Sequence, residues 1–306
     1  MVRWPYRCIM GLSHVTRHPM LFSAFKRESS ACARTYRNRK ALILGTGRSL
    51  RGVLSEISTR IEADREKGPT LWAVNNFALS SEFVRLQPQN YVLLDPDFHS
   101  RTSVDGTAQR NALLSALSAV TWPMYLWIPM VAAVNPMWIE FFGRKPPNLR
   151  VVPFPSRTYE ASLPLARAAQ SLFGFAPNYQ NVVTLSAFLA LHFGASEVGL
   201  VGADHNWHQD MIVGEDNVLR THVPHFDDKT ARPAPTIFLH SVEKGAFRVS
   251  EIFSALSITF QGHEEVQSVA KRLGRNVINL TPQSFIDAYP RGNLSDWLNA
   301  NPETKR

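Results

Sequence analysis

From residue 41 onward, the chain alternates short apolar runs with longer segments of helical pattern, and this alternation restricts the fold more than any other feature. Parallel strands are buried on both faces and are joined through helices, so this order predicts βαβ units. The clearest unit spans 181–202, where an apolar helical segment, Gly194 at the expected left-handed position and the run EVGLVG follow one another. We therefore expect an α/β, Rossmann-like fold with a mainly parallel sheet and helices on both faces.

The expected elements also define the domains. Strands are predicted at 41–45, 71–74, 91–95, 124–128, 150–154, 197–202 and 276–280, and helices at 50–66, 106–119, 181–193 and 247–273. Residues 204–240 break the alternation with five histidines and three prolines, and long stretches without regular structure are usually functional. We interpret them as a lid or acceptor-binding insertion in a catalytic domain at 41–291, followed by a solvated tail at 292–306.

The net charge of +8 resides in residues 1–40, which hold nine Lys or Arg against Glu28 alone. A basic arm on a neutral body suits an anionic membrane surface, whereas a nucleic-acid partner would leave basic stripes on the body itself. We expect peripheral membrane binding through 1–40 and no nucleic-acid partner. The longest apolar stretch, 122–134, contains two prolines and is shorter than the roughly 20 residues of a membrane-spanning helix.

The arm and the cysteines bear on location. The arm lacks the continuous apolar region of a secretory signal, although its Arg-rich, acid-poor composition also resembles a mitochondrial transit peptide. The only cysteines are Cys8 and Cys32, which do not form a disulfide framework or a zinc-binding pattern. We predict a cytoplasmic protein, peripheral on the inner face of the membrane.

The segment ALILGTGRSL predicts a strand, a glycine-bearing turn and a helix. Gly45 and Gly47 allow a phosphate to approach the backbone, and the N–H groups at the helix start and the hydroxyls of Thr46 and Ser49 can donate to it. A tight strand-to-helix turn is the alternative interpretation. No G-K-[ST] follows, and Leu50 stands where a dinucleotide fingerprint has its third glycine, so neither motif is present.

Polar residues follow three predicted strands at the carboxyl edge, where open α/β sheets bind ligands. They are Asn75 and Asn76, Asp95 and Asp97, and Asp204. A histidine of the insertion suits a general base for a hydroxyl, and we select His225 together with Asp204 as the functional pair. The histidines lack the spacing of a zinc site, so no metal or other cofactor is expected.

The segments GTGRSL, VNNF, DPDF, LVGADHNW, PHF and NLTPQSFIDAYPR occur in this order within residues 40–291. Together they resemble glycosyltransferases of bacterial surface-polysaccharide clusters and, more distantly, the bacterial lipooligosaccharide sialyltransferases of glycosyltransferase family forty-two. The resemblance implies a Rossmann-like enzyme that uses a CMP-activated sugar, needs no obligatory metal and inverts the anomeric centre with a histidine base.

The resemblance also implies roles for single residues. The family's G-N-G-P-S loop corresponds to Gly45–Ser49, in which Thr46 replaces the asparagine and Arg48 replaces the proline and adds a cation beside the phosphate. Its nucleotide-contacting asparagine corresponds to Asn75 or Asn76. Its two phosphate-contacting tyrosines correspond to Tyr179 and to Leu185, which cannot donate a hydrogen bond. The histidine base corresponds to His225 or to His263, because Gly262-His263 matches the family's local pattern.

The expected function is an inverting, sialyltransferase-like transfer of a sugar from a nucleotide-sugar, CMP-linked, to a glycan or lipid-linked acceptor. Backbone amides, Arg48 and Ser284 would offset charge on the leaving phosphate. Two alternatives remain open. One is a Mg²⁺-dependent pyrophosphokinase of the pterin type, with the metal at Asp95 and Asp97. The other is a non-catalytic binding protein of polysaccharide assembly.

Overall fold

The structure is a computed structural model that describes residues 19–95, 98, 106–155, 180–222, 225–228 and 245–300. Two of the predicted site residues, Asp97 and Tyr179, lie outside these ranges.

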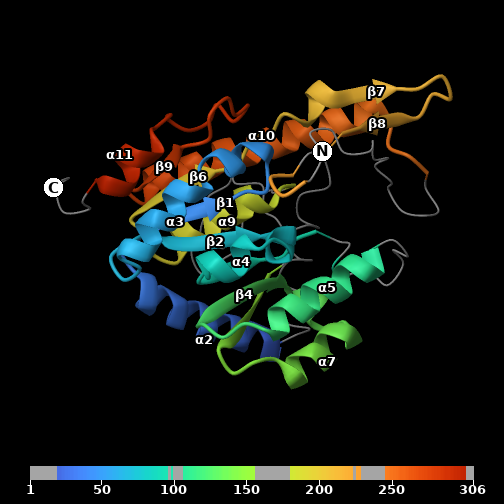
Figure 1. The fold of residues 1–306 in the computed structure, drawn as a ribbon. Coiled ribbons are helices and arrows are strands. Elements are labelled where there is room, and N and C mark those ends of the chain that lie inside the picture. Colours follow the sequence, from blue (N-terminus) through green and yellow to red (C-terminus); the bar gives the residue numbers. More distant parts are fainter. Residues whose placement is uncertain are drawn as a thin grey trace.

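A seven-stranded, entirely parallel sheet forms the centre of the molecule (Figure 1). In chain order its strands are β1 (Lys40–Leu44), β2 (Thr70–Val74), β3 (Asn90–Val92), β4 (Met124–Pro129), β5 (Leu149–Phe154), β6 (Glu197–Val201) and β9 (Asn276–Asn279). The spatial order is β5-β4-β3-β2-β1-β6-β9, so the chain reverses direction across the sheet at β1 and β6. The predicted α/β, Rossmann-like fold is confirmed.

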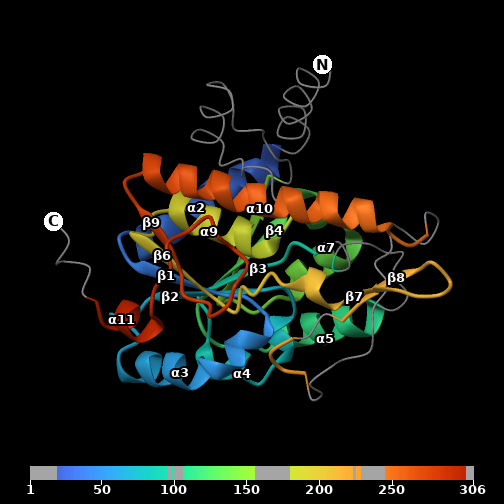
Figure 2. The same ribbon diagram turned by 90° about the horizontal axis from the view of Figure 1, so that it is seen from above.

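Helices cover both faces of this sheet, as Figure 2 shows. One face carries α2 (Pro19–Tyr36), α9 (Val182–His192) and α10 (Val249–Arg272), and the other carries α3 (Leu54–Ala63), α4 (Glu82–Leu86) and α5 (Gly106–Ser118). Successive residues of a strand point to opposite faces, so in β1 Leu42 and Leu44 join one apolar core while Ala41 and Ile43 join the other. This two-sided burial explains why the strands read as continuous apolar runs.

The remaining helices are shorter. They are α6 (Met130–Ala133), α7 (Pro136–Arg144), α11 (Leu294–Asn299) and the 3₁₀ turns η1 (Arg48–Gly52), η2 (Asn75–Leu79) and η4 (Trp207–Asp210). The solvated tail predicted at 292–306 is wrong for α11, because Leu294, Trp297 and Leu298 are buried in the core. The predicted helix 50–66 is divided between η1 and α3.

The predicted basic arm contributes to the folded body over residues 19–36. Phe25 and Cys32 of α2 are buried in the core. Two of the arm's cations also serve the fold: Arg39 donates to the carbonyls of Arg65 and Gly68, and Lys40 donates to those of Trp297 and Ala300. Membrane binding through the arm stays a prediction. Within the described part of the chain, no helix combines the length and apolarity needed to cross a membrane.

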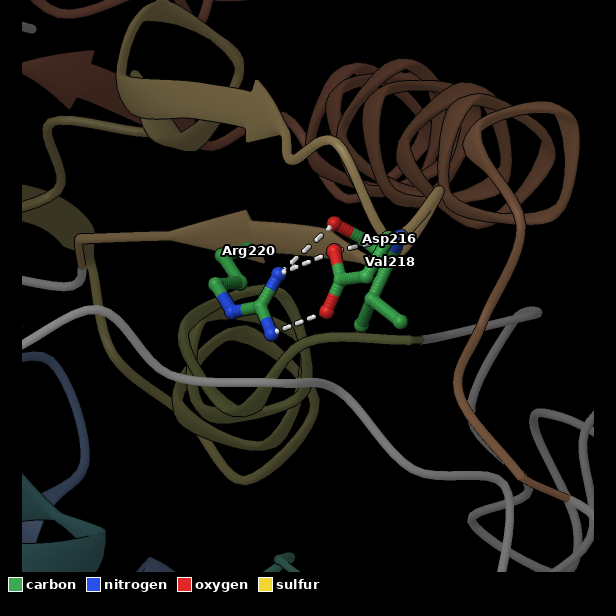
Figure 3. A network of polar contacts seen from close by, with 3 residues as sticks. All are labelled: Asp216, Val218 and Arg220. Atoms are coloured by element: carbon green, nitrogen blue, oxygen red, sulfur yellow. Dashed lines mark hydrogen bonds and ion pairs between the residues drawn. The ribbon is translucent and has the colours of Figure 1, made fainter.

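The insertion at 204–240 contains regular structure where none was expected. A β-hairpin pairs β7 (Met211–Val213) with β8 (Leu219–Thr221). Its turn is closed by Asp216, whose carboxylate accepts from both terminal nitrogens of Arg220, at 2.9 and 2.7 Å, and from the Val218 N–H (Figure 3). These hydrogen bonds lower the pKa of Asp216 to about 2, and those from Arg220 have the largest effect. Asn217 takes the left-handed backbone conformation that such turns require.

Candidate functional site

A cavity of about 410 Å³ opens at the carboxyl ends of β1, β2, β3 and β6, where the order of the strands reverses. This is the place at which open α/β sheets bind ligands. Its strand-side wall consists of Thr46 and Gly47 after β1, Asn75 after β2, Asp95 after β3, and Asp204 and His205 after β6. The opposite wall is largely apolar and comes from α9 and α10, with Val182, Ile252 and Leu256 among its residues.

The glycines of the predicted phosphate loop serve close packing between β1 and β6. A Cβ on Gly45 would overlap the carbonyl oxygen of Gly202, and a Cβ on Gly47 would lie 2.6 Å from the same oxygen and 2.7 Å from Asp204 Oδ2. Gly202 itself has a φ of +64°, which favours glycine. Gly47 borders the cavity, whereas Gly45 does not belong to its described wall. Gly45 therefore has a packing role, and its predicted phosphate contact stays a prediction.

Replacing Gly47 with alanine is expected to lower the free energy of unfolding by roughly 1–3 kcal/mol, because the new methyl group has no space beside Gly202 and Asp204. Chemical denaturation measures this loss. Gly52→Ala is the matched control in the same turn, where no atom of the described residues lies within 4 Å of the added carbon. Equal stability of both variants would contradict the packing assignment.

Asp204 fixes the loop that follows β1. Its Oδ2 accepts from the Ser49 backbone N–H at 3.0 Å, and its Oδ1 accepts from the Ser49 hydroxyl. A carboxylate in this position satisfies a free N–H group at the start of η1. The Ser49 hydroxyl, which was predicted to contact phosphate, therefore donates its hydrogen bond to Asp204 in this structure. Asp204 also borders the cavity; these two hydrogen bonds indicate a positioning role, and its catalytic role stays a prediction.

Three further predicted contacts do not belong to the described cavity wall. Arg48 lies outside it. The Ser284 hydroxyl is buried and donates to the Ala203 carbonyl at 2.6 Å, so its proton is not directed to a phosphate. Asn76 has a buried Oδ1 that finds no hydrogen-bond partner in the described structure. The predicted ligand contacts of these three residues therefore gain no support from the described cavity wall and stay predictions.

Asn75 and Asp95 do border the cavity, as the strand-end argument predicted. Asn75 has a φ of +44°, and its Oδ1 accepts from the Leu94 N–H at 3.2 Å. Tyr91 donates its hydroxyl to the Asn75 carbonyl. Because the side-chain oxygen is used in this way, the Asn75 amide NH₂ is the group left to donate to a ligand.

His225 also reaches the cavity, although it is distant in sequence from the strand ends. A single antiparallel bridge pairs it with Gly47, and Phe226 N–H donates to the Thr46 carbonyl at 3.1 Å. Asp228 Oδ2 accepts from the His225 N–H at 2.6 Å, while Arg51 donates to the carbonyls of Phe226 and Asp228. The His225 Nδ1 is buried and has no partner among the described residues.

His263 lies outside the described cavity wall and is fully buried in α10, so its predicted role as the base gains no support from its position. Burial lowers its pKa to about 3. Its Nε2 lies 3.0 Å from Nε2 of His205, which does border the cavity. Burial is the main cause that lowers the pKa of His205 well below its usual range, and the neighbouring His263 lowers it further. His205 directly follows Asp204 in the sequence, but nothing in the sequence distinguishes it from the other histidines of the insertion.

The fold and the site together define an α/β protein with a ligand-sized cavity at the switch point of a parallel sheet. Among the residues that the structure describes, no three His, Cys, Asp or Glu side chains are grouped closely enough to hold a metal ion. No protein-family model and no curated protein matches the chain.

Proposed function

We propose that this chain is a glycosyltransferase that moves a sugar from a CMP-linked donor to a hydroxyl of a glycan or lipid-linked acceptor. The observation that carries the proposal is the shared cavity at the switch point, which is lined by the loop after β1, Asn75, Asp95 and three histidines, His205, His222 and His225. The order of the sequence motifs, with their resemblance to surface-polysaccharide glycosyltransferases, supports the choice of sugar transfer.

His225 is the general base in this proposal. The acceptor O–H proton moves to the imidazole as the acceptor oxygen bonds to the anomeric carbon. The bond between that carbon and the phosphate oxygen breaks, and its electrons stay on the departing CMP. Attack opposite the leaving group inverts the anomeric centre. The unpartnered Nδ1 and the backbone contacts that fix His225 beside Gly47 support this role.

The donor's phosphate is proposed to lie against Thr46 and Gly47, with the Asn75 amide as a second donor. Asp204 acts on the reaction indirectly, because its two hydrogen bonds with Ser49 hold this loop in place. The apolar residues of α9 and α10 exclude water from the sugar side of the cavity, which strengthens these polar contacts.

The test is to incubate the pure protein with a panel of nucleotide-sugars and nucleoside triphosphates, with and without EDTA. We expect release of CMP from a CMP-sugar and no loss of turnover with EDTA. Cleavage of ATP that stops with EDTA would instead identify a pyrophosphokinase. Thermal stabilisation without turnover of any compound would identify a binding protein. Either result would overturn the transferase proposal.

A further inference from the structure

The cavity needs hydrogen-bond donors for an anionic ligand, and several expected ones are directed elsewhere. The hydroxyl of Ser49 is held by Asp204 and that of Ser284 by the Ala203 carbonyl, and Arg48 lies outside the described wall. His205 stands on the wall, between the end of β6 and the ring of Trp207, whose centroid is 4.5 Å away. Its ring is therefore a candidate donor that the proposed mechanism has not used.

A chain of buried polar groups leads from His205 into the protein. His205 Nε2 lies 3.0 Å from His263 Nε2, and His263 Nδ1 lies 2.9 Å from the Tyr289 hydroxyl. Thr184 Oγ1 on α9 also lies 3.1 Å from His263 Nε2. His263 is 0% exposed and Tyr289 is 3% exposed, so solvent does not replace a missing partner here.

Counting the protons of these buried groups favours one of two possible hydrogen-bond arrangements. The described structure offers the Tyr289 hydroxyl one acceptor, His263 Nδ1. If Tyr289 donates to it, neutral His263 carries its proton on Nε2 and donates to His205 Nε2. In the opposite arrangement the buried Tyr289 proton has no acceptor, and both Thr184 and His205 compete for one lone pair on His263. Because orphaned buried donors are costly, the first arrangement is favoured.

His205 therefore accepts through Nε2 and carries its own proton on Nδ1. Nδ1 is the ring nitrogen left for a molecule in the cavity. Burial keeps both rings neutral, since the pKa of each is lowered by desolvation. A neutral N–H donor of fixed direction suits a phosphate oxygen, and it needs no nearby counter-charge.

We propose that His205 binds the donor's phosphate as a neutral Nδ1–H donor, held in this tautomer by His263 and Tyr289. The phosphate identity rests on the proposed function, whereas the tautomer follows from the contacts alone. The same donor would steady the phosphate as the sugar leaves, because charge on its oxygens increases in that step.

The first arm of the test uses the protein alone. Nitrogen NMR of ¹⁵N-histidine-labelled protein assigns the protonated nitrogen of each ring. We expect protons on Nδ1 of His205 and on Nε2 of His263. Tyr289→Phe removes the hydroxyl and should shift the His263 Nδ1 resonance, since that nitrogen loses its hydrogen bond. Protonation of His205 at Nε2 in the wild-type protein would overturn the proposal.

The second arm separates phosphate binding from the shape of the cavity. His205 has a φ of +53°, so its replacements are Gly and Asn, which tolerate the left-handed region. His205→Gly should weaken CMP binding about tenfold because a donor to a charged group is lost. His205→Asn should restore most of that affinity, because its amide nitrogen replaces Nδ1. Cytidine, which lacks the phosphate, should bind all three proteins alike in calorimetric titration.

Two controls complete the design. His208→Ala removes an imidazole three residues away that contacts Phe285 and does not belong to the described cavity wall, so CMP affinity should not change. Inorganic phosphate is titrated beside CMP, because a phosphate contact does not depend on the base. Equal losses of CMP and cytidine affinity in His205→Gly, or an Asn variant as weak as the Gly variant, would overturn the phosphate contact.

The outcomes also separate this inference from the proposed function. Turnover of a CMP-sugar together with unchanged CMP affinity in His205→Gly would refute the inference and support the transferase. His205-dependent binding of phosphate without turnover of any nucleotide-sugar would support the inference and refute the transferase. Binding of neither CMP nor phosphate by the wild-type protein would overturn both.

Discussion

Replacing His225 with alanine is expected to lower kcat for sugar transfer roughly 10²–10⁴-fold, the usual contribution of a positioned general base. The donor should bind almost as before, because the base acts on the acceptor hydroxyl in the transition state. The main-chain contacts of His225 with Asp228 and Gly47 do not involve its side chain, so the loop should keep its place. Steady-state kinetics with one CMP-sugar and one acceptor, together with CMP titration, measure the two effects.

His263 gives a direct comparison within the same protein. Its ring contacts Thr184, His205 and Tyr289 and is fully buried. His263→Gln should therefore lower the free energy of unfolding and change kcat less than His225→Ala does. Full activity of the His225 variant would exclude this residue as the base. A larger loss of kcat in a folded His263 variant would show that the buried histidine chain contributes more to the rate than His225 does.

The sequence predicted all seven strands of the central sheet because most of their residues are buried and apolar, although the edge strands β5 and β9 also carry the exposed Arg150 and Asn276. Even β3, the shortest at Asn90–Val92, lies within the predicted segment 91–95 except for its first residue. The parallel direction followed from the helical segments between the runs. Predicting that Asn75, Asp95 and Asp204 meet required only this topology, since the carboxyl ends of parallel strands share one edge.

The features that the sequence did not predict depend on contacts between distant segments. Trp297 reads as part of a polar tail and is buried only because α11 packs against the core. The pattern of α2 gives no sign that the Cys32 thiol donates to the side-chain oxygen of Asn90, the first residue of β3. The β7–β8 hairpin depends on the geometry of Asp216 and Arg220, which charge pattern alone does not specify.

The direction of each side chain in the site was also beyond the sequence. A glycine after a strand suggests that phosphate can approach the backbone, but the sequence does not show in which direction a side chain would point. At Gly47 a Cβ would point to the neighbouring loop of Gly202 and Asp204. The hydroxyls of Ser49 and Ser284 have the right chemistry but donate within the protein. Histidines of one insertion look alike in sequence, and only burial and distance separate His205 from His208.

Lowering the pH from 7 to 4 is expected to destabilise this fold steeply through two buried histidines, His205 and His263, and the half-buried His192. Burial, with Lys26 and Arg275 nearby, lowers the pKa of His192 to about 4; burial lowers that of His263 to about 3 and that of His205 well below its usual range. The unfolded chain titrates near pH 6.5 and so binds protons that the native state does not. Stability is therefore complete above about pH 6.5 and falls as the pH decreases.

Below about pH 6, each such histidine should remove about 1.4 kcal/mol of unfolding free energy per pH unit, and the three together roughly 4 kcal/mol per pH unit. This is a large part of a typical total stability of about 5–15 kcal/mol. Urea unfolding at a series of pH values measures the slope. His192 lies outside the described cavity wall and stacks on Phe188, so His192→Gln serves as the matched variant. Its slope should be lower by about one histidine's share, whatever its absolute stability. A wild-type stability that is constant between pH 7 and 5 would show that these rings take up protons in the native state as they do in the unfolded chain, against the lowering of their pKa by burial.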